Sequence, residues 1–318
     1  MELRPAGIVV EYNQRGRKRA GLPAGSEMKL PVRRPFGRRT ERTERKRRRM
    51  NVFISSDIEG TCGVAAWSET EPGKTGGNYE YFCAQMSREV AAACRGALAA
   101  GAGRVLVKDA HDSARNLDPA VLPEEVQLNR GWSGDVYSMM SGIQRGDWDA
   151  AAFTGYHAAA GCAGNPLSHT MNPRVDCVEI NGVRASEFTI NAYMAGYHRV
   201  PVCFVSGDAA LCEAARKMIP DIAAVPVNKG DGNSATCLHP ALAVRRIEQT
   251  LREQLESGAY RRCIVPMPPK FEIAIRYKEH RDAYRSSFYP GVEQGDEKTI
   301  RFSCVDYYDA MCLFQFVL

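Results

Sequence analysis

The stretch Asn51-Val-Phe-Ile-Ser-Ser-Asp57-Ile-Glu59-Gly60 combines a strand signal with two acidic side chains. Residues 52–54 form the continuous apolar run that is typical of a short strand covered on both faces. Side chains two positions apart in an extended chain point the same way, so Asp57 and Glu59 face one side, roughly 6.6 Å apart. Neighbouring carboxylates repel each other unless protons, solvent or a cation intervene. The stretch therefore predicts a buried strand that ends either in a solvated acidic loop or in a cation site.

Charge is distributed unevenly along the 318 residues. Residues 1–49 hold 16 Lys/Arg against 5 Asp/Glu, a net charge of +11, whereas the remainder holds 26 against 32, a net charge of −6. The first segment lacks apolar periodicity and is predicted to be a disordered basic extension, upstream of a natural start at Met50. Its basic cluster is a candidate for binding nucleic-acid phosphates, but a basic segment without a folded nucleic-acid-binding domain is more often simply solvated. We expect the extension to contribute nothing to the fold or the site.

Composition places the rest of the chain among ordinary globular proteins. Hydrophobic residues make up 44% of the chain, and no apolar run approaches the roughly 18 to 20 residues that span a bilayer. There is no apolar segment with a small-residue cleavage site, which argues against a secretory signal. The eleven cysteines are odd in number, scattered, and form no C-x-x-C pair. We therefore expect a reduced, cytoplasmic protein without a membrane segment.

From Met50 onward, strand and helix patterns alternate. Residues 78–100 carry apolar side chains at helical spacing, and residues 104–111 read as a second buried strand. A strand, a crossover helix and a parallel strand form a right-handed unit whose two strand ends meet at one edge of the sheet. Ligands of open α/β sheets bind along that edge. His111 is therefore expected to lie near Asp57 and Glu59.

Later segments repeat this arrangement. The predicted elements are a strand at 148–157 that ends in His157, an Asn-Gly hairpin at 177–184, a helix capped by Ser186 that begins at Glu187, a strand at 201–208, a helix at 209–219, a turn at 229–232, a helix at 240–256 and alternating strands at 271–277 and 299–305. The predicted fold class is α/β, with a mainly parallel sheet flanked by helices and a smaller C-terminal α+β lobe. Residues 50–318 form the predicted domain, with a lobe boundary within 221–270 and Pro266 to Pro269 as its best candidate.

Three strand ends and one helix start supply two histidines and three carboxylates: Asp57, Glu59, His111, His157 and Glu187. Imidazole ligands favour transition metals such as zinc or manganese over calcium. A catalytic zinc takes three protein ligands and a water, so five ligands suit two metals if one carboxylate bridges them. Metals about 3.5 to 4 Å apart can activate water and polarise a carbonyl. An ordinary loop or core position is the simpler interpretation of either histidine alone, and their shared place at the sheet edge favours the metal site.

The order and spacing of several short motifs resemble those of the M55 peptidases, the D-aminopeptidases of the dipeptide-transport type. The motifs run from Met50 to near the C-terminus: S-x-D-x-E-G at Ser55 to Gly60, D-x-H at Asp109 to His111, G-Y-H-A at Gly155 to Ala158, S-H-T-M at Ser168 to Met171, Asn181-Gly182 with Glu187, and Gly207-Asp208. The resemblance implies two zinc ions per subunit, held by the five residues named above with Asp57 shared between them. Manganese or cobalt could replace zinc.

The resemblance also implies a function. It assigns a catalytic role to His169 and predicts a metallo-aminopeptidase that hydrolyses short peptides or amides with an N-terminal D-amino acid. It further implies homo-oligomeric rings around a channel. Two departures bear on substrate preference and subunit packing: Gly-Asp-Gly-Asn-Ser follows Lys229 where the family often has an arginine, and the last helix stops at Leu318.

Alternative functions are a binuclear phosphoesterase or other esterase, and non-enzymatic nucleic-acid binding through the basic extension. A phosphoesterase needs basic side chains at the sheet edge, and Lys108 is expected to point away from Asp109 in an alternating strand. An aminopeptidase must also hold the substrate α-amine. Asp109 and Asp208 are candidates, although a structural role is the favoured interpretation of both. Cys62 has no histidine placed to activate it, which argues against a thiol nucleophile.

Overall fold

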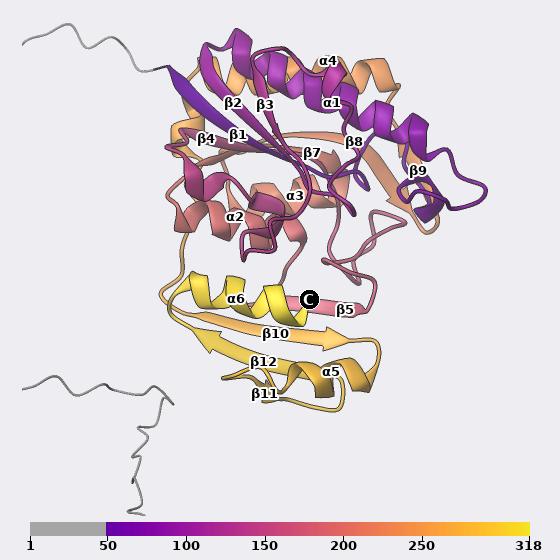
Figure 1. Ribbon diagram of the computed structural model, residues 1–318, viewed down its shortest axis with the longest axis vertical. Coiled ribbons are helices and arrows are strands. Elements are labelled where there is room, and N and C mark those ends of the chain that lie inside the picture. The colour runs from indigo at the N-terminus through magenta and orange to yellow at the C-terminus, as the bar shows by residue number, and fades with distance from the viewer. Residues whose placement is uncertain (1–48) are drawn as a thin grey trace, which may run out of the picture. The chain divides into compact units, whose positions relative to one another are not determined.

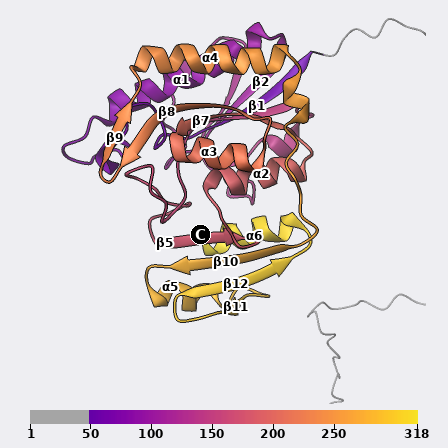
Figure 2. The same cartoon turned by 180° about the vertical axis from the view of Figure 1, so that it is seen from behind.

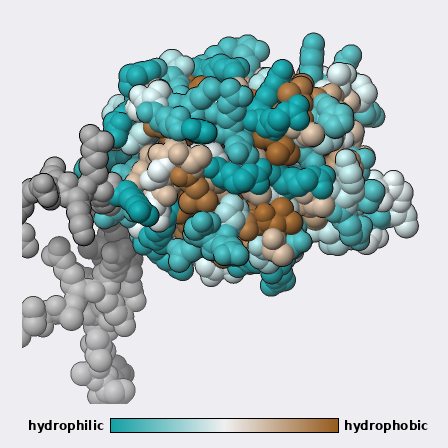
Figure 3. Space-filling model, turned by 90° about the horizontal axis from the view of Figure 1, so that it is seen from above, coloured by the Kyte–Doolittle hydropathy of each residue, from teal (hydrophilic) through white to brown (hydrophobic). Residues whose placement is uncertain are grey.

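The computed structural model describes residues 49–318, which belong to one compact unit of the chain. The predicted basic extension therefore lies outside the described residues, apart from Arg49. Among the described residues, no helix is both long and apolar enough to cross a membrane. Seen from above, hydrophilic side chains dominate the surface, and hydrophobic ones are scattered among them (Figure 3).

A mainly parallel sheet forms the larger layer of the fold (Figure 1). Within residues 49–318 its seven strands are, in spatial order, β3 (Val126–Asn129), β2 (Ala102–Asp109), β1 (Met50–Ser56), β4 (Ala150–Tyr156), β7 (Val202–Asp208), β8 (Ala223–Asp231) and β9 (Ser234–Cys237). All neighbours pair in parallel except β8 and β9, which form a hairpin. The central strands are apolar on both faces, as predicted, because helices cover both.

Helices on the two faces of this sheet explain that burial (Figures 1 and 2). One face carries α1 (Tyr79–Ala99) and α4 (Pro240–Glu256), and the other carries α2 (Glu187–Tyr197) and α3 (Ala209–Met218). Short 3-10 helices lie in the connections: η1 (Trp67–Glu69), η2 (Pro119–Val121), η3 (Ser138–Met140), η4 (Ile143–Arg145) and η5 (Ala259–Arg262). The predicted helices over 78–100, 209–219 and 240–256 are confirmed within two residues at either end.

A smaller antiparallel sheet lies beside the α2 and α3 layer (Figure 1). Its five strands in the described part of the chain are β11 (Glu293–Gln294), β12 (Thr299–Cys304), β10 (Phe271–Tyr277), β5 (Val175–Ile180) and β6 (Val183–Arg184). Helix α6 (Tyr307–Val317) lies between this sheet and α2, and α5 (His280–Ser286) packs on β10 and β12. The smaller lobe is thus not purely C-terminal, because the β5–β6 hairpin joins it from the middle of the chain.

The region after Asp221 is more regular than its sequence indicates. The turn predicted at residues 229–232 is misplaced, since β8 continues to Asp231 and the chain reverses only at Gly232 and Asn233. Antiparallel pairing with β9 keeps these residues extended, and the Gly230 amide also donates to the Gly164 carbonyl at 2.9 Å. Turn-forming residues signal a reversal, but partner strands decide where it falls.

A buried acid on α1 links stability to pH. Glu89 is 1% exposed, and its Oε1 accepts hydrogen bonds from the Cys62 amide at 3.0 Å and from Gln85 Nε2 at 2.8 Å. Burial raises the pKa of this carboxyl from 4.5 to about 7 and outweighs the two hydrogen bonds. Because the native state then binds more protons than the unfolded chain between these pH values, the free energy of unfolding falls as pH rises from about 4.5 to 7.

Glu89→Gln removes this titration and keeps an Oε1 acceptor for both hydrogen bonds. We expect the variant to be more stable than the parent at pH 8, by on the order of 3 kcal/mol, with the difference shrinking toward pH 5. Thermal melts across this pH range measure the effect. Glu80→Gln, at an exposed position of the same helix, is the matched control and should leave the pH profile unchanged; an identical profile for Glu89→Gln would contradict the prediction.

Candidate metal centre

Asp57 and Glu59 lie in the tight turn that follows β1 and are each 2% exposed. Two backbone hydrogen bonds tie this turn to the end of β4: the Asp57 amide donates to the Thr154 carbonyl at 2.9 Å, and the Gly60 amide to the Gly155 carbonyl at 2.8 Å. The carboxyl end of β1 is thereby fixed against the segment that leads into His157. The expected meeting of strand ends at this edge of the sheet is confirmed.

His111 follows β2 and faces both of these carboxylates. Its Nδ1 lies 3.1 Å from Glu59 Oε1 and 3.5 Å from Asp57 Oδ1. Its Nε2 lies 2.7 Å from the Thr70 carbonyl, which can only accept a hydrogen bond, so Nε2 carries a proton. This contact fixes the ring and turns Nδ1 toward the acids.

His157 follows β4 and approaches Asp57 from the other side. Its Nε2 lies 3.5 Å from Asp57 Oδ2 and 3.4 Å from Glu187 Oε2, while Nδ1 donates to the Ala158 carbonyl at 3.0 Å. Glu187 begins α2 as predicted, and Ser186 Oγ caps this helix by accepting from the Thr189 amide at 3.3 Å. The cap holds Glu187 in the first turn, where its Oε1 also accepts from the Met171 amide at 2.7 Å.

His169 lies in the loop after β4 and joins the same cluster. Its Nε2 is 3.3 Å from Glu187 Oε1 and 3.9 Å from Glu59 Oε1, and its Nδ1 donates to the Leu167 carbonyl at 2.8 Å. The ring stacks on His157 with centroids 4.3 Å apart. With its side chain 12% exposed, it is more open to solvent than His157, which is fully buried.

The donor atoms of this cluster fit a divalent cation. Within residues 49–318, buried Asp57 Oδ2, Glu59 Oε2 and His157 Nε2 have no hydrogen-bond partner. Ligand atoms of Asp57, Glu59 and His157, and those of His157, His169 and Glu187, form two groups whose members lie within 4.8 Å of one another. Each histidine donates one N–H to a backbone carbonyl and turns its other nitrogen to a carboxylate. If the ring is neutral, the lone pair on this second nitrogen faces the lone pairs of a carboxylate oxygen and the two atoms repel each other. A cation bound to both atoms removes that repulsion.

Electrostatics in the cluster lead to the same conclusion. Burial works against the charged form of His111 and His157, but the carboxylates of Glu59, Asp57 and Glu187 outweigh it and raise both histidine pKa values well above the ordinary value. Burial likewise opposes ionisation of Glu187, and His157 and His169 overcome it, lowering the pKa of that carboxyl to about 2. The negative charge of the carboxylates, which favours protons on these histidines, would equally favour a metal cation in place of those protons.

Two further acids at strand ends accept hydrogen bonds from backbone amides. Asp109 accepts from the Asn116 amide at 2.6 Å, the Leu117 amide at 2.8 Å and Asn116 Nδ2 at 2.9 Å. Asp208 accepts from the Ala158 amide at 2.7 Å, the Leu211 amide at 2.8 Å and Asn165 Nδ2 at 3.2 Å. Their lone pairs are already used to hold the loops after His111 and His157. Both acids therefore have the structural role that the sequence analysis favoured.

Cys62 also has a structural place. It is buried, its Sγ donates to the Leu238 carbonyl at 3.1 Å, and burial raises the pKa of the thiol well above its ordinary value. A thiol held in its neutral form is a poor nucleophile, in agreement with the sequence analysis.

A cavity of about 180 Å³ opens over the cluster. Its lining residues are Asp57, Glu59, Ala110, His111, Asp112, Trp132, Ser138, Met139, His169, Met171 and Glu187. No sequence pattern assigned Asp112, Trp132, Met139 or Met171 to the site. Asp112 follows a proposed ligand directly, which is a usable signal, whereas nothing in the sequence places Trp132 beside residues 20 positions away.

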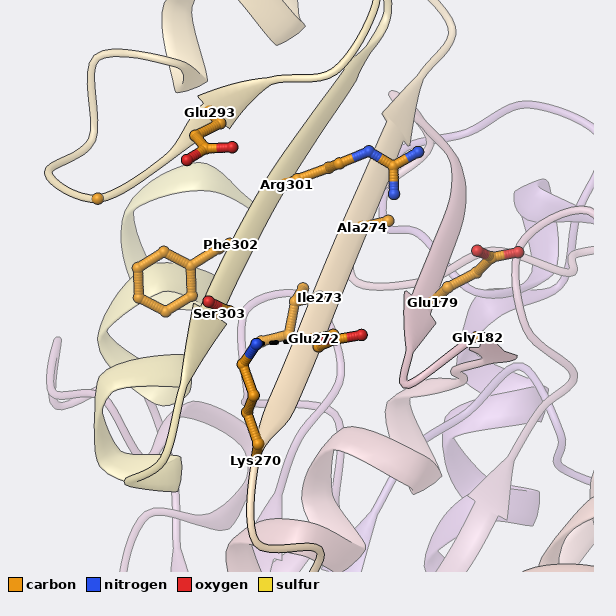
Figure 4. Close-up of a pocket in the computed structure, with 11 residues that line it drawn as sticks. Glu179, Gly182, Lys270, Glu272, Ile273, Ala274, Glu293, Arg301, Phe302 and Ser303 are labelled. Atoms are coloured by element: carbon orange, nitrogen blue, oxygen red, sulfur yellow. Dashed lines mark hydrogen bonds and ion pairs between the residues drawn. The ribbon is translucent and has the colours of Figure 1, made fainter.

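A larger hollow of about 430 Å³ lies on the outer face of the small sheet (Figure 4). Charged side chains of both signs line it, including Glu179, Glu293 and Arg301, and Lys270 pairs with Glu272 at 3.0 Å. Among the described residues that line it there is no histidine or cysteine. Size does not identify the chemical site here, because Asp57, Glu59, His111, His169 and Glu187 of the histidine and carboxylate cluster line the smaller cavity.

Comparisons with known proteins agree with this geometry. The peptidase M55 family model, described as D-aminopeptidase, matches residues 50–316. A relative, D-aminopeptidase of Bacillus subtilis (strain 168), is 31% identical over 265 residues, which cover 82% of this chain and 94% of the relative. A solved structure of zinc-dependent D-aminopeptidase DppA from Bacillus subtilis, described as a self-compartmentalizing protease, has a TM-score of 0.77 and 28% identity, and the match covers 84% of this chain and 96% of that one.

Buried histidines and carboxylates at the carboxyl ends of the strands of an open α/β sheet have the position and chemistry of an enzyme active site. The chain belongs to the peptidase M55 family, since the family model spans nearly all of the described residues. It is therefore a peptide-bond hydrolase, as predicted.

Gly60 allows the close approach on which the site depends. A Cβ atom at this position would lie 1.8 Å from the Tyr156 carbonyl oxygen, a backbone atom that cannot move away. We expect Gly60→Ala to separate the turn after β1 from β4, to lower stability by at least about 1 to 3 kcal/mol, and to weaken metal binding. Thermal melts and metal analysis of one preparation test this. A variant with the parent's melting temperature and metal content would contradict it.

Proposed function

We propose that the protein is a binuclear zinc aminopeptidase that hydrolyses short peptides or amides with an N-terminal D-residue. The observation that carries this proposal is the position of the Asp57 carboxylate, whose Oδ1 faces His111 and whose Oδ2 faces His157, each at 3.5 Å. A carboxylate with its two oxygens directed at two different histidines is placed to bridge two cations. The zinc and D-residue parts rest on the names of the relatives.

The five proposed ligands then divide into two overlapping sets. Asp57, Glu59 and His111 would hold one ion, and Asp57, His157 and Glu187 would hold the other. Three protein ligands per ion leave room for water or substrate, as catalytic zinc requires. Zinc bound at such a site would act as a Lewis acid that polarises a carbonyl and lowers the pKa of bound water toward 7. The carboxylates keep their orientation through the turn after β1 and the Ser186 cap.

His169 is proposed as the proton-transfer residue. Its Nδ1–H is committed to the Leu167 carbonyl, so Nε2 is the atom that can accept or donate a proton at the cavity. The edge of Trp67, with ring centroids 5.0 Å apart, and the stacked ring of His157 keep the imidazole in place. General acid–base catalysis of this kind contributes about 10²- to 10⁴-fold. Its Nε2 also lies near Glu187, so the alternative role of His169 is that of a metal ligand.

Cavity size supports an exopeptidase acting on small substrates. At about 180 Å³ the cavity is smaller than the roughly 300 to 1,000 Å³ of typical ligand pockets. It can enclose about one residue, with the remainder of a peptide outside. Among the described residues that line it there is no lysine or arginine, and Lys108 is fully buried. This weighs against the phosphoesterase alternative, which needs cations for a phosphate.

We further propose that the chain forms a homo-oligomer, because the related DppA is described as a self-compartmentalizing protease. Large apolar side chains are exposed on the smaller lobe: Phe288 is 71% exposed and Phe316 74%. Burial between subunits would remove them from water. All eleven cysteines, which lie within the described residues, are free, and this is consistent with the proposed cytoplasmic location.

Metal analysis together with a substrate screen tests the central proposal. We expect about two zinc ions per chain, hydrolysis of D-aminoacyl amides in preference to their L-isomers, and loss of hydrolysis on chelation, because the carbonyl is no longer polarised. Restoring zinc should restore activity. Protein that binds no metal and shows no chelator-sensitive hydrolysis would refute the proposal.

Histidine variants separate the proposed roles. His111→Ala or His157→Ala should lose metal as well as activity, whereas His169→Ala should keep both ions while turnover falls by about 10²-fold or more. Metal content and turnover are measured on the same preparation, with His280→Ala, an exposed position on α5, as control. Near-normal turnover of His169→Ala would mean that this ring only packs the loop. Loss of one metal equivalent would make it a ligand.

A further inference from the structure

The chain reverses sharply directly after His111. Asp112 has φ 43° and Ala114 has φ 54°, both in the left-handed region that L-residues rarely occupy. Two backbone hydrogen bonds hold this conformation: the Ala114 amide donates to the His111 carbonyl at 2.7 Å, and the Gly131 amide to the Ala114 carbonyl at 2.8 Å. Strained backbone of this kind is concentrated at functional sites, and here it places Asp112 in the lining of the cavity.

Trp132 is fixed against the same turn. Its Nε1 donates to the Asp112 carbonyl at 2.6 Å, and the Lys108 ammonium lies 4.5 Å from the ring centroid. Lys108 Nζ also donates to the Gly131 carbonyl at 2.6 Å, and this hydrogen bond keeps the ammonium group against the indole ring. The tryptophan is nevertheless 44% exposed and lines the cavity. Asp112 and Trp132 thus form one preorganised wall.

Among the described residues, four acidic residues line the cavity, and Asp112 differs from the other three. Asp57, Glu59 and Glu187 are at most 3% exposed and face histidines. Asp112 is exposed, and within residues 49–318 no hydrogen bond or ion pair engages its carboxylate. Asp57, Glu59 and Glu187 are the proposed metal ligands, and Asp112 remains available to bind another positively charged group.

We propose that Asp112 binds the α-ammonium group of the N-terminal residue of the substrate, while Trp132, Met139 and Met171 contact the side chain of that residue. This assignment rests on the proposed aminopeptidase function. A charged amine that enters a cavity loses water, and a charge-assisted hydrogen bond to a carboxylate offsets that loss. Asp109 and Asp208 cannot serve, because backbone amides and asparagine side chains already occupy their oxygens.

Asp112→Asn tests the assignment, since it removes the charge, keeps the shape and tolerates the left-handed backbone. The substrates are D-alaninamide and D-lactamide, which differ only in an ammonium against a hydroxyl group. For D-alaninamide we expect kcat/KM to fall about 10- to 100-fold, mainly through KM, with D-lactamide unaffected. If Asp112 has a merely structural role, Asp112→Asn would lower kcat/KM for both substrates alike, and this result would overturn the proposal.

Binding without hydrolysis gives a second measurement. The zinc-loaded protein is titrated by calorimetry with D-alaninol and with (R)-1,2-propanediol, neither of which has a scissile bond. We expect the parent to prefer the amine and Asp112→Asn to lose that preference by a similar factor, with metal content and melting temperature unchanged. Glu125→Gln removes an equal charge from an exposed position outside the cavity lining and should behave like the parent.

The two proposals fail in different ways. If the parent hydrolyses D-alaninamide and Asp112→Asn keeps the full preference for amines, the Asp112 assignment is wrong and the aminopeptidase proposal stands. If the parent hydrolyses no amide, the aminopeptidase proposal is wrong, and the D-alaninol titration alone decides whether Asp112 binds ammonium groups.

Discussion

The contact between the turn after β1 and the end of β4 is the constraint on which the rest of the site depends. Two backbone hydrogen bonds and the absence of a side chain at Gly60 bring these segments together. The contact sets the spacing between the Asp57 and Glu59 carboxylates and His157. Parallel pairing of β1 with β2 adds His111 at the same edge. The sheet thus acts as the rigid element that functional sites require, while the ligand-type side chains lie just beyond its strand ends or, for Glu187, in the first turn of α2.

Buried carboxylates at this spacing create an electrostatic requirement. Removing Asp57, Glu59 and Glu187 from water is costly unless positive charge accompanies them, and the nearby groups able to supply it are histidines. Each ring has one N–H bound by a backbone carbonyl, so the orientation of the other nitrogen is not free to relax. The cluster is consequently preorganised for positive charge, and the cavity that Trp132 helps to line opens over it.

Much of the architecture was predictable because local signals agreed with the fold. The apolar runs of β1, β2, β4 and β7 are where expected, and the Asn181-Gly182 turn adopts the positive φ angles that a tight hairpin needs. Prediction was poorer where pairing partners decide the outcome. The β8 strand extends through a Gly-Asp-Gly segment because β9 pairs with it, and β5 joins a sheet whose other main strands come about 100 residues later.

The α/β class, the ligand-type residues and their places at three strand ends and one helix start follow from the sequence, because alternation of short apolar runs and helices allows few topologies. The surroundings of the other acids depend on the tertiary structure. Asp109, Asp112 and Asp208 all follow or end strands, yet two accept hydrogen bonds from backbone amides and asparagine side chains, and one lines the cavity. That difference depends on loop conformation and on contacts such as the one between Trp132 and Asp112, which join residues distant in sequence. Local pattern carries no information about such contacts, so the hydrogen-bond partners of each carboxylate become visible only in three dimensions.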